Sequence, residues 1–328
     1  MIKVFLALIL TVEFGYSQIL IKGIVRDQST EKPIAYANIG IVNTGVGTIS
    51  NEDGTFSLKL PEQNKNDSVL FSAIGYGRKN ISTQSLIASK ITIFLEEKIT
   101  QLNEVTIAST KEKNKHFELG NSSCKGGVLQ TDTTYSGSSI ALLIENKNPY
   151  YEDLIFPVFV GQARIRIYRN NLLSFKLRLR LYSLDSLTNQ PGEDLLDKSV
   201  VVESSMRNGW LEFNLSPFKI LGSKPFFIAF ERILTETDRI DIANGYREFK
   251  RNNPDKVKVD TVLFEGKKVV REILKGGGID LPGTFIGIAT SESARQQHIC
   301  YTRKTSFDKW EKVRGILTAT VILTNQLD

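Results

Sequence analysis

Short runs of alternating apolar and polar residues occur along most of the chain, and they predict β-strands rather than helices. Phe56, Leu58 and Leu60 alternate with polar residues, so all three share one face of a predicted strand. The same two-residue period recurs in the second half, most clearly at residues 163–168, 174–182 and 210–215. Helical periodicity is limited to a turn or two near residues 241–249. The pattern predicts an all-β protein of antiparallel strands.

Turn-forming residues divide the first part of the chain, residues 18–108, into short strands. Pro33 has no amide hydrogen, so it belongs at the start of a strand or at a sheet edge. The sequence Asn51-Glu52-Asp53-Gly54 predicts a tight turn in which Gly54 takes a positive φ. Further strands are predicted at residues 69–74 and 91–95. These elements suit a small antiparallel sandwich of seven strands.

The order of these motifs resembles the carboxypeptidase-like regulatory domain, a prealbumin-like (transthyretin-like) β-sandwich. This module is found on secreted Bacteroidetes proteins and in front of TonB-dependent outer-membrane receptors. The resemblance implies a unit of folding and interaction rather than an active site, and none of the zinc ligands of the carboxypeptidases is present. The sequence Leu102-Asn103-Glu104-Val105-Thr106-Ile107 resembles the short strand that leads into the receptor plug. No plug signature follows it, so the resemblance implies the shared module and not a transporter.

The rest of the chain is predicted as a linker, residues 109–130, and a second β-sandwich, residues 131–328. The linker prediction rests on the charged and polar stretch at residues 108–115, which lacks apolar periodicity. The sequence around Gly209-Trp210, followed by Pro225 and an apolar strand, loosely resembles jelly-roll sandwiches of the carbohydrate-binding-like kind. That resemblance implies a jelly-roll-type fold and does not identify a ligand.

The first 17 residues predict a secretory signal peptide. Lys3 precedes a short apolar run, and small residues precede the expected cleavage after Ser17. No later apolar run approaches the roughly 20 residues that a transmembrane helix needs, so no transmembrane segment is expected after signal cleavage. The protein is therefore expected to be exported, to the periplasm, the outer membrane or the extracellular space.

The charged residues give little support to nucleic-acid binding. The formal net charge is +6, but basic residues are interspersed with acidic ones. Arg164, Arg166, Arg178 and Arg180 alternate with apolar residues, which is typical of the solvated face of a half-buried strand. We therefore expect these four arginines to face solvent.

The sequence has two cysteines, Cys124 and Cys300. In an exported protein such a pair often forms a disulfide, which here would close a long loop. The alternative is that both are small buried hydrophobic residues.

No group of residues predicts a catalytic or metal site. The two histidines, His116 and His298, belong to no paired-ligand motif. His298 and Cys300 share one face of a predicted strand, either as the start of a site or as an inward-facing pair. No catalytic residue, metal or cofactor is predicted.

Aromatic residues are the best candidates for a ligand surface, because their rings stack on sugars and Tyr and Trp add a polar group. The candidates lie near loops or strand ends of the second domain: Tyr150, Tyr151, Trp210, Tyr301 and Trp310. Each of them is also suited to filling a core.

These observations predict an exported, non-catalytic binding or accessory protein of the cell envelope. The expected partner is a polysaccharide or an outer-membrane or other envelope protein. The alternatives are a secreted hydrolase acting on envelope or dietary polymer, and a structural role in which an exposed strand edge pairs with a partner.

Overall fold

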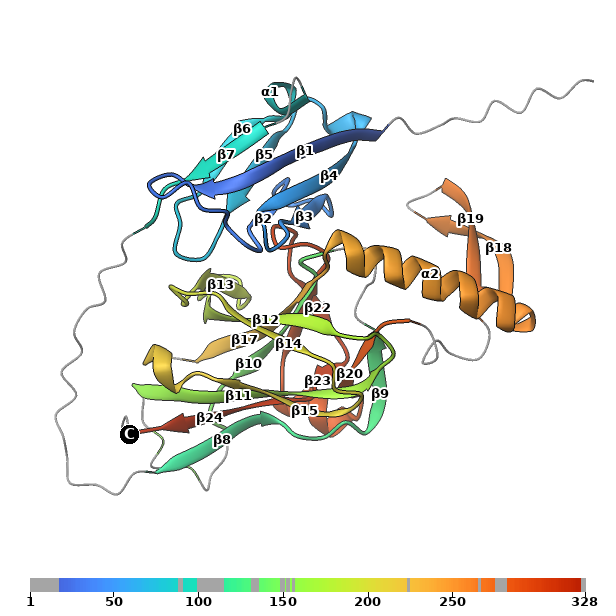
Figure 1. The fold of residues 1–328 in the computed structure, drawn as a ribbon. Helices are drawn as coiled ribbons and strands as arrows, with labels where there is room; N and C mark the ends of the chain where they lie inside the picture. Colours follow the sequence, from blue (N-terminus) through green and yellow to red (C-terminus); the bar gives the residue numbers. More distant parts are fainter. Residues whose placement is uncertain are drawn as a thin grey trace, which may run out of the picture.

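β-Strands form most of the computed structural model of this chain, as the alternating pattern predicts (Figure 1). The all-β prediction is confirmed. The structure describes residues 18–87, 91–98, 115–130, 136–147, 151, 154, 157–222, 225–264, 267–274 and 282–325. The predicted signal peptide, the Leu102–Ile107 motif and Tyr150 lie outside these residues.

The N-terminal domain is a sandwich of seven strands in two sheets, as the sequence predicts. Its strands are β1 (Gln18–Asp27), β2 (Asn38–Gly40), β3 (Gly47–Ile49), β4 (Thr55–Pro61), β5 (Ser68–Ser72), β6 (Lys79–Ser82) and β7 (Ile91–Leu95). One sheet has the order β4-β1-β7 and the other β3-β2-β5-β6. A single helical turn, α1 (Thr83–Ile87), follows β6. The predicted apolar faces meet between the sheets, where Phe56, Leu58 and Leu60 are buried.

The tight turn before β4 has the predicted geometry. Gly54 has a φ of 74°, and a Cβ at this position would lie 2.5 Å from the carbonyl oxygen of Val25. Only glycine combines this backbone conformation with so close an approach. The turn also contains Asn51, Glu52 and Asp53.

The C-terminal domain is a larger sandwich of two antiparallel sheets. The seven-stranded sheet consists of β10 (Ser139–Ile144), β12 (Phe175–Leu184), β13 (Pro191–Asp194), β14 (Val200–Ser204), β17 (Phe226–Ile233), β21 (Cys300–Arg303) and β22 (Glu311–Val313). The eight-stranded sheet consists of β8 (His116–Asn121), β9 (Gly126–Gln130), β11 (Val158–Asn170), β15 (Gly209–Asn214), β16 (Leu221–Gly222), β20 (Thr284–Ala289), β23 (Ile316–Leu317) and β24 (Ala319–Thr324). The inner faces of the two sheets form one continuous apolar core.

An insertion between β17 and β20 carries the longest helix in the described part of the chain. It comprises α2 (Glu236–Asn252) and the hairpin of β18 (Val257–Phe264) and β19 (Lys267–Leu274). The sequence predicts only a turn or two of helix here, because apolar periodicity is weak and Ile242 alone is buried among the helical residues. A capping box explains the early start: the Thr235 side chain accepts from the Asp238 amide, and the Asp238 carboxylate accepts from the Thr235 amide. A short helix, α3 (Glu292–Gln297), precedes β21.

The linker prediction for residues 109–130 is wrong in its second half. β8 pairs with β24, and β9 pairs with β20, so residues 116–130 belong to the eight-stranded sheet. His116, which the sequence places in the linker, begins β8 and lies opposite Thr324. Pairing with strands more than 150 residues away in the sequence supplies the order that local composition does not indicate.

Of the two alternatives for Cys124 and Cys300, the structure does not contain the disulfide, because both residues are free thiols. Cys300 lies in the core between the two sheets, where its sulfur accepts a hydrogen bond from the Leu317 amide at 3.3 Å. Cys124 lies beside Gly287 and the Arg166 side chain, on the outer face of the eight-stranded sheet. A sheet therefore separates the two sulfur atoms.

The two thiols are expected to differ strongly in reactivity. Burial raises the pKa of the Cys300 thiol to about 12, so the reactive thiolate is scarce at neutral pH, whereas Cys124 is only half-buried. A thiol assay on the folded protein should count one fast-reacting cysteine, and in denaturant it should count two. The Cys124→Ser variant should lose the fast reaction. An unreactive folded protein that needs a reductant before two thiols appear would instead show a disulfide.

Candidate functional site at the domain interface

The N-terminal domain packs on the outer face of the seven-stranded sheet of the C-terminal domain (Figure 1). Leu177, Leu179 and Leu181 on β12 point into the sandwich core. Arg178 and Arg180 alternate with them and therefore lie on the outer face, as predicted. The prediction that they face solvent is wrong, because the side chain of Arg178 is only 1% exposed and Arg180 is also buried.

Glu231 is at the centre of the contact between the domains, and its carboxylate is completely buried. Glu231 Oε2 accepts hydrogen bonds from Arg178 Nε at 2.8 Å and from Arg180 Nη1 at 3.2 Å. Arg180 also donates from Nε to Asp194 Oδ2 at 2.5 Å. β12 and β17 are adjacent, and Arg178 lies directly opposite Glu231 in their register. The two arginines thus share the carboxylate of Glu231, and Arg180 also pairs with Asp194.

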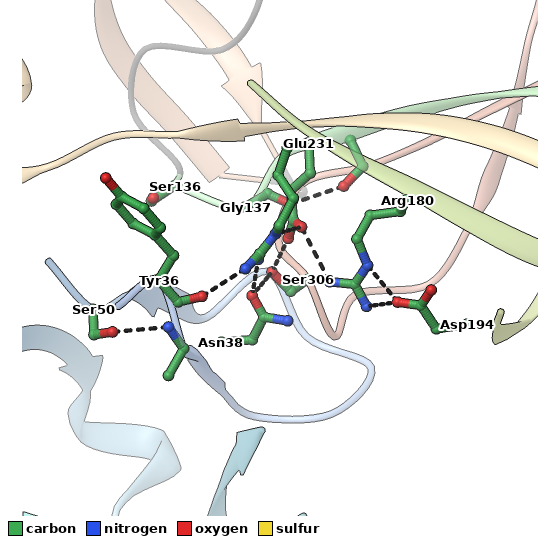
Figure 2. A network of polar contacts seen from close by, with 12 residues as sticks. Tyr36, Asn38, Ser50, Ser136, Gly137, Arg180, Asp194, Glu231 and Ser306 are labelled. Carbon is green, nitrogen blue, oxygen red and sulfur yellow. Dashed lines mark hydrogen bonds and ion pairs between the residues drawn. The ribbon is translucent and has the colours of Figure 1, made fainter. Parts of the chain in front are cut away.

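The same network continues into the N-terminal domain (Figure 2). Arg178 Nη1 donates to the backbone carbonyl of Tyr36 at 2.6 Å, and Nη2 donates to Asn38 Oδ1. Ser306 completes the group, because its hydroxyl lies within hydrogen-bond distance of Asn38 Oδ1, at 3.1 Å, and of Glu231 Oε1. Tyr36 has a φ of 57°, a conformation that is uncommon for a tyrosine and that is held within this contact. One guanidinium group therefore joins the two domains.

The electrostatics of this network favour an ionised Glu231. Burial by itself raises the pKa of this carboxyl, but Arg178, Arg180 and Arg303 outweigh burial and lower the pKa to about 2. Glu231 therefore carries its negative charge at neutral pH, and the buried positive charges are compensated.

Further contacts beside the network join the β2–β3 turn of the N-terminal domain to the C-terminal domain. The amide of Asn43, in the turn between β2 and β3, donates to the carbonyl of Phe307 at 2.9 Å. Thr305 Oγ1 donates to the carbonyl of Thr44 at 3.3 Å. Gly47 lies so close to Thr305 that a Cβ there would be 3.0 Å from the threonine Cβ. The loop between β21 and β22 is thus fitted against the β2–β3 turn.

Helix α2 also contacts both domains. Arg239 donates from Nη2 to Thr48 Oγ1 of β3 at 3.3 Å. On the same helix, Gly245 lies against Pro282, where a Cβ would be 2.8 Å from the proline ring. The absence of a side chain at Gly245 lets the helix approach this loop. The helix is therefore placed as a wall beside the junction of the two domains.

A cleft of about 1070 Å³ lies between these elements. The N-terminal domain contributes Asn51, Glu52 and Asp53 from the turn before β4. The loop between β11 and β12 contributes residues 171–174, and α2 with the residues that flank it contributes most of the remaining wall. Lys176 of β12 and Pro282 complete the described lining. Pockets at domain junctions are common sites of ligand binding.

Amide and carboxylate side chains dominate the described lining of this cleft. The amides and hydroxyls are Asn51, Asn171, Ser174, Thr235, Thr237, Asn252 and Asn253. The charged groups are Glu52, Asp53, Glu236, Asp238, Asp241 and Glu248 against Lys176 and Lys256. Leu173 and Phe249 add apolar surface, and Leu173 is 83% exposed. The cleft is thus acidic and rich in hydrogen-bonding groups.

The spacing of the cleft residues on α2 follows the helical period. Asp241, Gly245, Glu248 and Asn252 are three or four residues apart, so they form one face of the helix, and all four line the cleft. Asp241, Glu248 and Asn252 are exposed. This face can therefore present three polar side chains to a molecule in the cleft.

Some cleft groups are already oriented by internal hydrogen bonds. Tyr36 donates from its hydroxyl to Glu52 Oε1 at 2.5 Å, and Asp238 takes part in the capping box of α2. Hydrogen bonds from the Thr55 side chain and amide lower the pKa of Asp53, whereas a general acid needs a raised pKa. These groups suit the binding of a ligand better than acid catalysis.

The predicted aromatic ligand residues do not form a shared surface. Tyr151 packs edge-on against Phe117, with ring centroids 5.3 Å apart, and Arg164 lies over the Trp210 ring. Tyr301 and Trp310 do come together, in a small apolar cluster on the outer face of the seven-stranded sheet. None of these four described residues lines the cleft.

His298 and Cys300 do not form a site. His298 is the C-cap residue of α3, and burial with the nearby Lys147 lowers its pKa, while Cys300 is enclosed in the core. Within the described ranges, no group of three or more His, Cys, Asp or Glu is arranged to hold a metal ion. Nor is any described helix long and apolar enough to cross a membrane.

The sequence pattern alone does not predict the cleft or the buried network. Arg178, Asn38 and Glu231 lie far apart in the chain, and only the packing of the two domains brings them together. Arg232 and Glu231 within an apolar strand were the available signal, because two adjacent charges in a buried run require polar partners.

Comparisons with known proteins agree with the N-terminal fold. Residues 21–107 match the family model of the CarboxypepD_reg-like domain. The chain therefore carries this domain, and the identification made from the sequence motifs is confirmed. The TonB-dependent receptor SusC of Bacteroides thetaiotaomicron is 31% identical over 124 residues, which is 37% of this chain and 12% of the receptor. The similarity thus spans about an eighth of the receptor's length.

Proposed function

We propose that this protein is an exported accessory protein of the cell envelope that binds a neutral polysaccharide in the interdomain cleft. The cleft is the observation that carries the proposal. It joins residues of the CarboxypepD_reg-like domain to α2 and the second sandwich, so each domain supplies part of one binding surface.

The envelope setting is supported by two features of the N-terminal part. The first 17 residues have the pattern of a secretory signal peptide. The domain that follows is similar to part of a TonB-dependent receptor. Both features favour a place of action outside the cytoplasm.

The chemistry of the lining supports a saccharide ligand. Each sugar hydroxyl both donates and accepts hydrogen bonds, and Asn and carboxylate side chains can pair with such groups through two polar atoms. Asn51, Asn171 and Asn252 supply amides from three different elements. Phe249 and Leu173 supply apolar surface for the apolar face of a sugar ring, which its C–H groups form.

The charge of the cleft favours neutral over acidic sugars. Six carboxylates and two lysines line its described part. A uronic acid polymer would bring further negative charge toward this surface, and like charges in a cleft repel. We therefore expect neutral glucans, mannans or xylans to bind and pectin or alginate not to bind.

Affinity electrophoresis of the full chain in gels containing single polysaccharides tests the proposal. Neutral polymers should retard the protein, and alginate should not. The Asn252→Ala variant should weaken retardation about fivefold, because one hydrogen bond contributes roughly 1 kcal/mol. Asn244→Ala is the matched control, since Asn244 is an exposed asparagine of the same helix outside the cleft lining.

Equal effects of the two asparagine variants would contradict a site in the cleft. Migration unaffected by every polysaccharide, together with recovery of an outer-membrane protein by crosslinking in the native envelope, would overturn the proposal in favour of a protein partner.

A further inference from the structure

A second cavity, of about 280 Å³, lies between the two sheets of the C-terminal sandwich. None of its described lining residues also lines the interdomain cleft. A molecule bound in this cavity would therefore be independent of the proposed polysaccharide site.

The floor of this cavity is apolar. Ile140, Leu177 and Phe230 come from the seven-stranded sheet, and Ile165 and Ile286 come from the eight-stranded sheet. All five side chains are at most 5% exposed and belong to the main core. Such walls offer water few hydrogen bonds, and a dry cavity of about 150 Å³ with similar walls is large enough to bind benzene. The floor therefore suits a hydrocarbon group.

Two hydroxyl groups lie at the polar end of the floor. Ser138 immediately precedes β10 and is two residues before Ile140, and Thr302 of β21 lies directly opposite Ile140. Both are half-buried and line the cavity. Thr302 Oγ1 donates to the carbonyl of Ser139 at 2.9 Å, so its oxygen remains able to accept. This end of the cavity suits a ligand group that both donates and accepts hydrogen bonds.

The two arginines at the mouth are already engaged within the fold. Arg232 is only 2% exposed and has an interaction partner. Arg303 donates from Nη2 to the Tyr182 hydroxyl at 2.5 Å, and its guanidinium lies 4.3 Å from the centroid of the Trp310 ring. Neither guanidinium group is therefore assigned to a ligand.

The other charges of the described lining balance one another. They are two lysines and two carboxylates from the segment that includes the β21–β22 loop: Lys304, Asp308, Lys309 and Glu311. A charged ligand that entered the apolar floor would lose its hydration without gaining a free partner of opposite charge, which is costly. The lining therefore favours an uncharged ligand.

Contacts with the N-terminal domain support the loop that frames the mouth. The Asn43 amide donates to the Phe307 carbonyl at 2.9 Å, and a Cβ on Gly45 would lie 3.6 Å from Lys304 Cδ. The mouth is thus built before a ligand arrives, and a preformed site loses less conformational entropy on binding.

We propose that this cavity binds an uncharged aliphatic molecule with a single chain and a terminal hydroxyl group, a primary alcohol of medium chain length. Its chain occupies the apolar floor, and its hydroxyl pairs with the hydroxyls of Ser138 and Thr302. The volume is just below the range of roughly 300 to 1,000 Å³ for ordinary ligand pockets, so the ligand is small.

Isothermal titration calorimetry of the full chain with 1-butanol, 1-hexanol and 1-octanol tests the ligand class. Affinity should rise about fourfold for each methylene between butanol and hexanol, because each one adds apolar surface to the buried chain. Hexanoate and hexylammonium have a chain of the same length but carry a charge. Each should bind at least about 10-fold more weakly than hexanol.

Methyl NMR of the unmodified protein locates the ligand without a risk to folding. With isoleucine δ1 methyl groups labelled, hexanol should shift the signals of Ile140, Ile165 and Ile286, which line the cavity. The signals of Ile39 and Ile93, in the core of the N-terminal domain, should stay unchanged.

Substitutions test the same assignment by calorimetry. Ile165→Phe should fill the floor and abolish hexanol binding. Ile322→Phe adds the same bulk at a half-buried position of the same sheet outside the described lining, so it is the matched control and should bind as the parent protein does. Ser138→Ala should weaken hexanol binding about fivefold, the effect of one lost hydrogen bond.

Several results would overturn the proposal. They are no binding of any of the three alcohols, equal affinity for hexanol and hexanoate, or hexanol-induced shifts that leave Ile140, Ile165 and Ile286 unchanged. Unchanged affinity in a folded Ile165→Phe protein or in Ser138→Ala would also contradict it. None of these results bears on polysaccharide binding, because the two sites share no described residue.

Discussion

Replacing Glu231 with alanine is expected to lower the free energy of unfolding by about 3 to 5 kcal/mol, the usual cost of leaving buried charge without its partner. Glu231 is completely buried and accepts from both Arg178 and Arg180. Without it, Arg178 retains only the Tyr36 carbonyl and the Asn38 side chain among its described partners. Urea unfolding followed by circular dichroism measures the loss.

Two further variants separate unpaired charge from lost packing. Glu203→Ala removes an exposed carboxylate that pairs with Lys176, and it should change stability by no more than about 0.5 kcal/mol. The double variant Arg178→Leu with Glu231→Leu should be less destabilised than Glu231→Ala, because it removes both charges together. A small effect of Glu231→Ala, equal to that of Glu203→Ala, would contradict a buried network.

Acid should destabilise the protein through the same carboxylate. The pKa of Glu231 is about 2 in the folded state and near its ordinary value of 4.5 in the unfolded state. Its contribution is therefore fully present above pH 4.5 and is lost as the pH falls toward 2. At about 1.4 kcal/mol per pKa unit, the contribution is roughly 3 kcal/mol.

Comparison with the Glu231→Gln variant isolates this effect. Unfolding measured between pH 7 and pH 2 should show a steeper loss of stability in the parent protein than in the variant. The groups that face Glu231 are Arg178 and Arg180 of β12 and Arg303 of β21, with the Ser306 hydroxyl, and the arginines stay charged throughout this range. Asp27 and Asp185 also have lowered pKa values, but they contribute equally to both proteins. Parallel pH curves would show that Glu231 is not held ionised by the arginines.

The sequence predicts the fold of the N-terminal domain well, because the patterns that indicate its strands and turns depend on neighbouring residues. The alternation of Phe56, Leu58 and Leu60 and the turn at Gly54 each depend on neighbouring residues only. Alternation also predicts correctly that Arg178 and Arg180 point away from the sandwich core. What covers that outer face depends on another domain, and no local pattern reports it.

The predictions that the structure contradicts also concern contacts between distant parts of the chain. Residues 116–130 look like a linker, yet they pair with β24 and β20 from the end of the chain. Two cysteines in an exported protein often form a disulfide, but in this fold a sheet lies between them. The candidate cleft could not be predicted, because its three walls come from the turn at residues 51–53, the loop at 171–174 and α2.

If the cleft binds a polysaccharide as proposed, the two domains act as one unit in function as well as in structure. The buried network holds the turn before β4 at a fixed place relative to α2, and the cleft exists only while both are in position. Rigid elements that present polar groups at fixed spacing lose little conformational entropy when a ligand binds.

Hydrogen exchange of the full chain, measured by mass spectrometry with and without the neutral polysaccharide that retards it most, tests this claim most directly. Added protection is expected in three separate segments, residues 51–53, 171–174 and 236–253, and thus in both domains at once. Protection confined to one domain, or found only away from these segments, would contradict a polysaccharide site shared by the two domains.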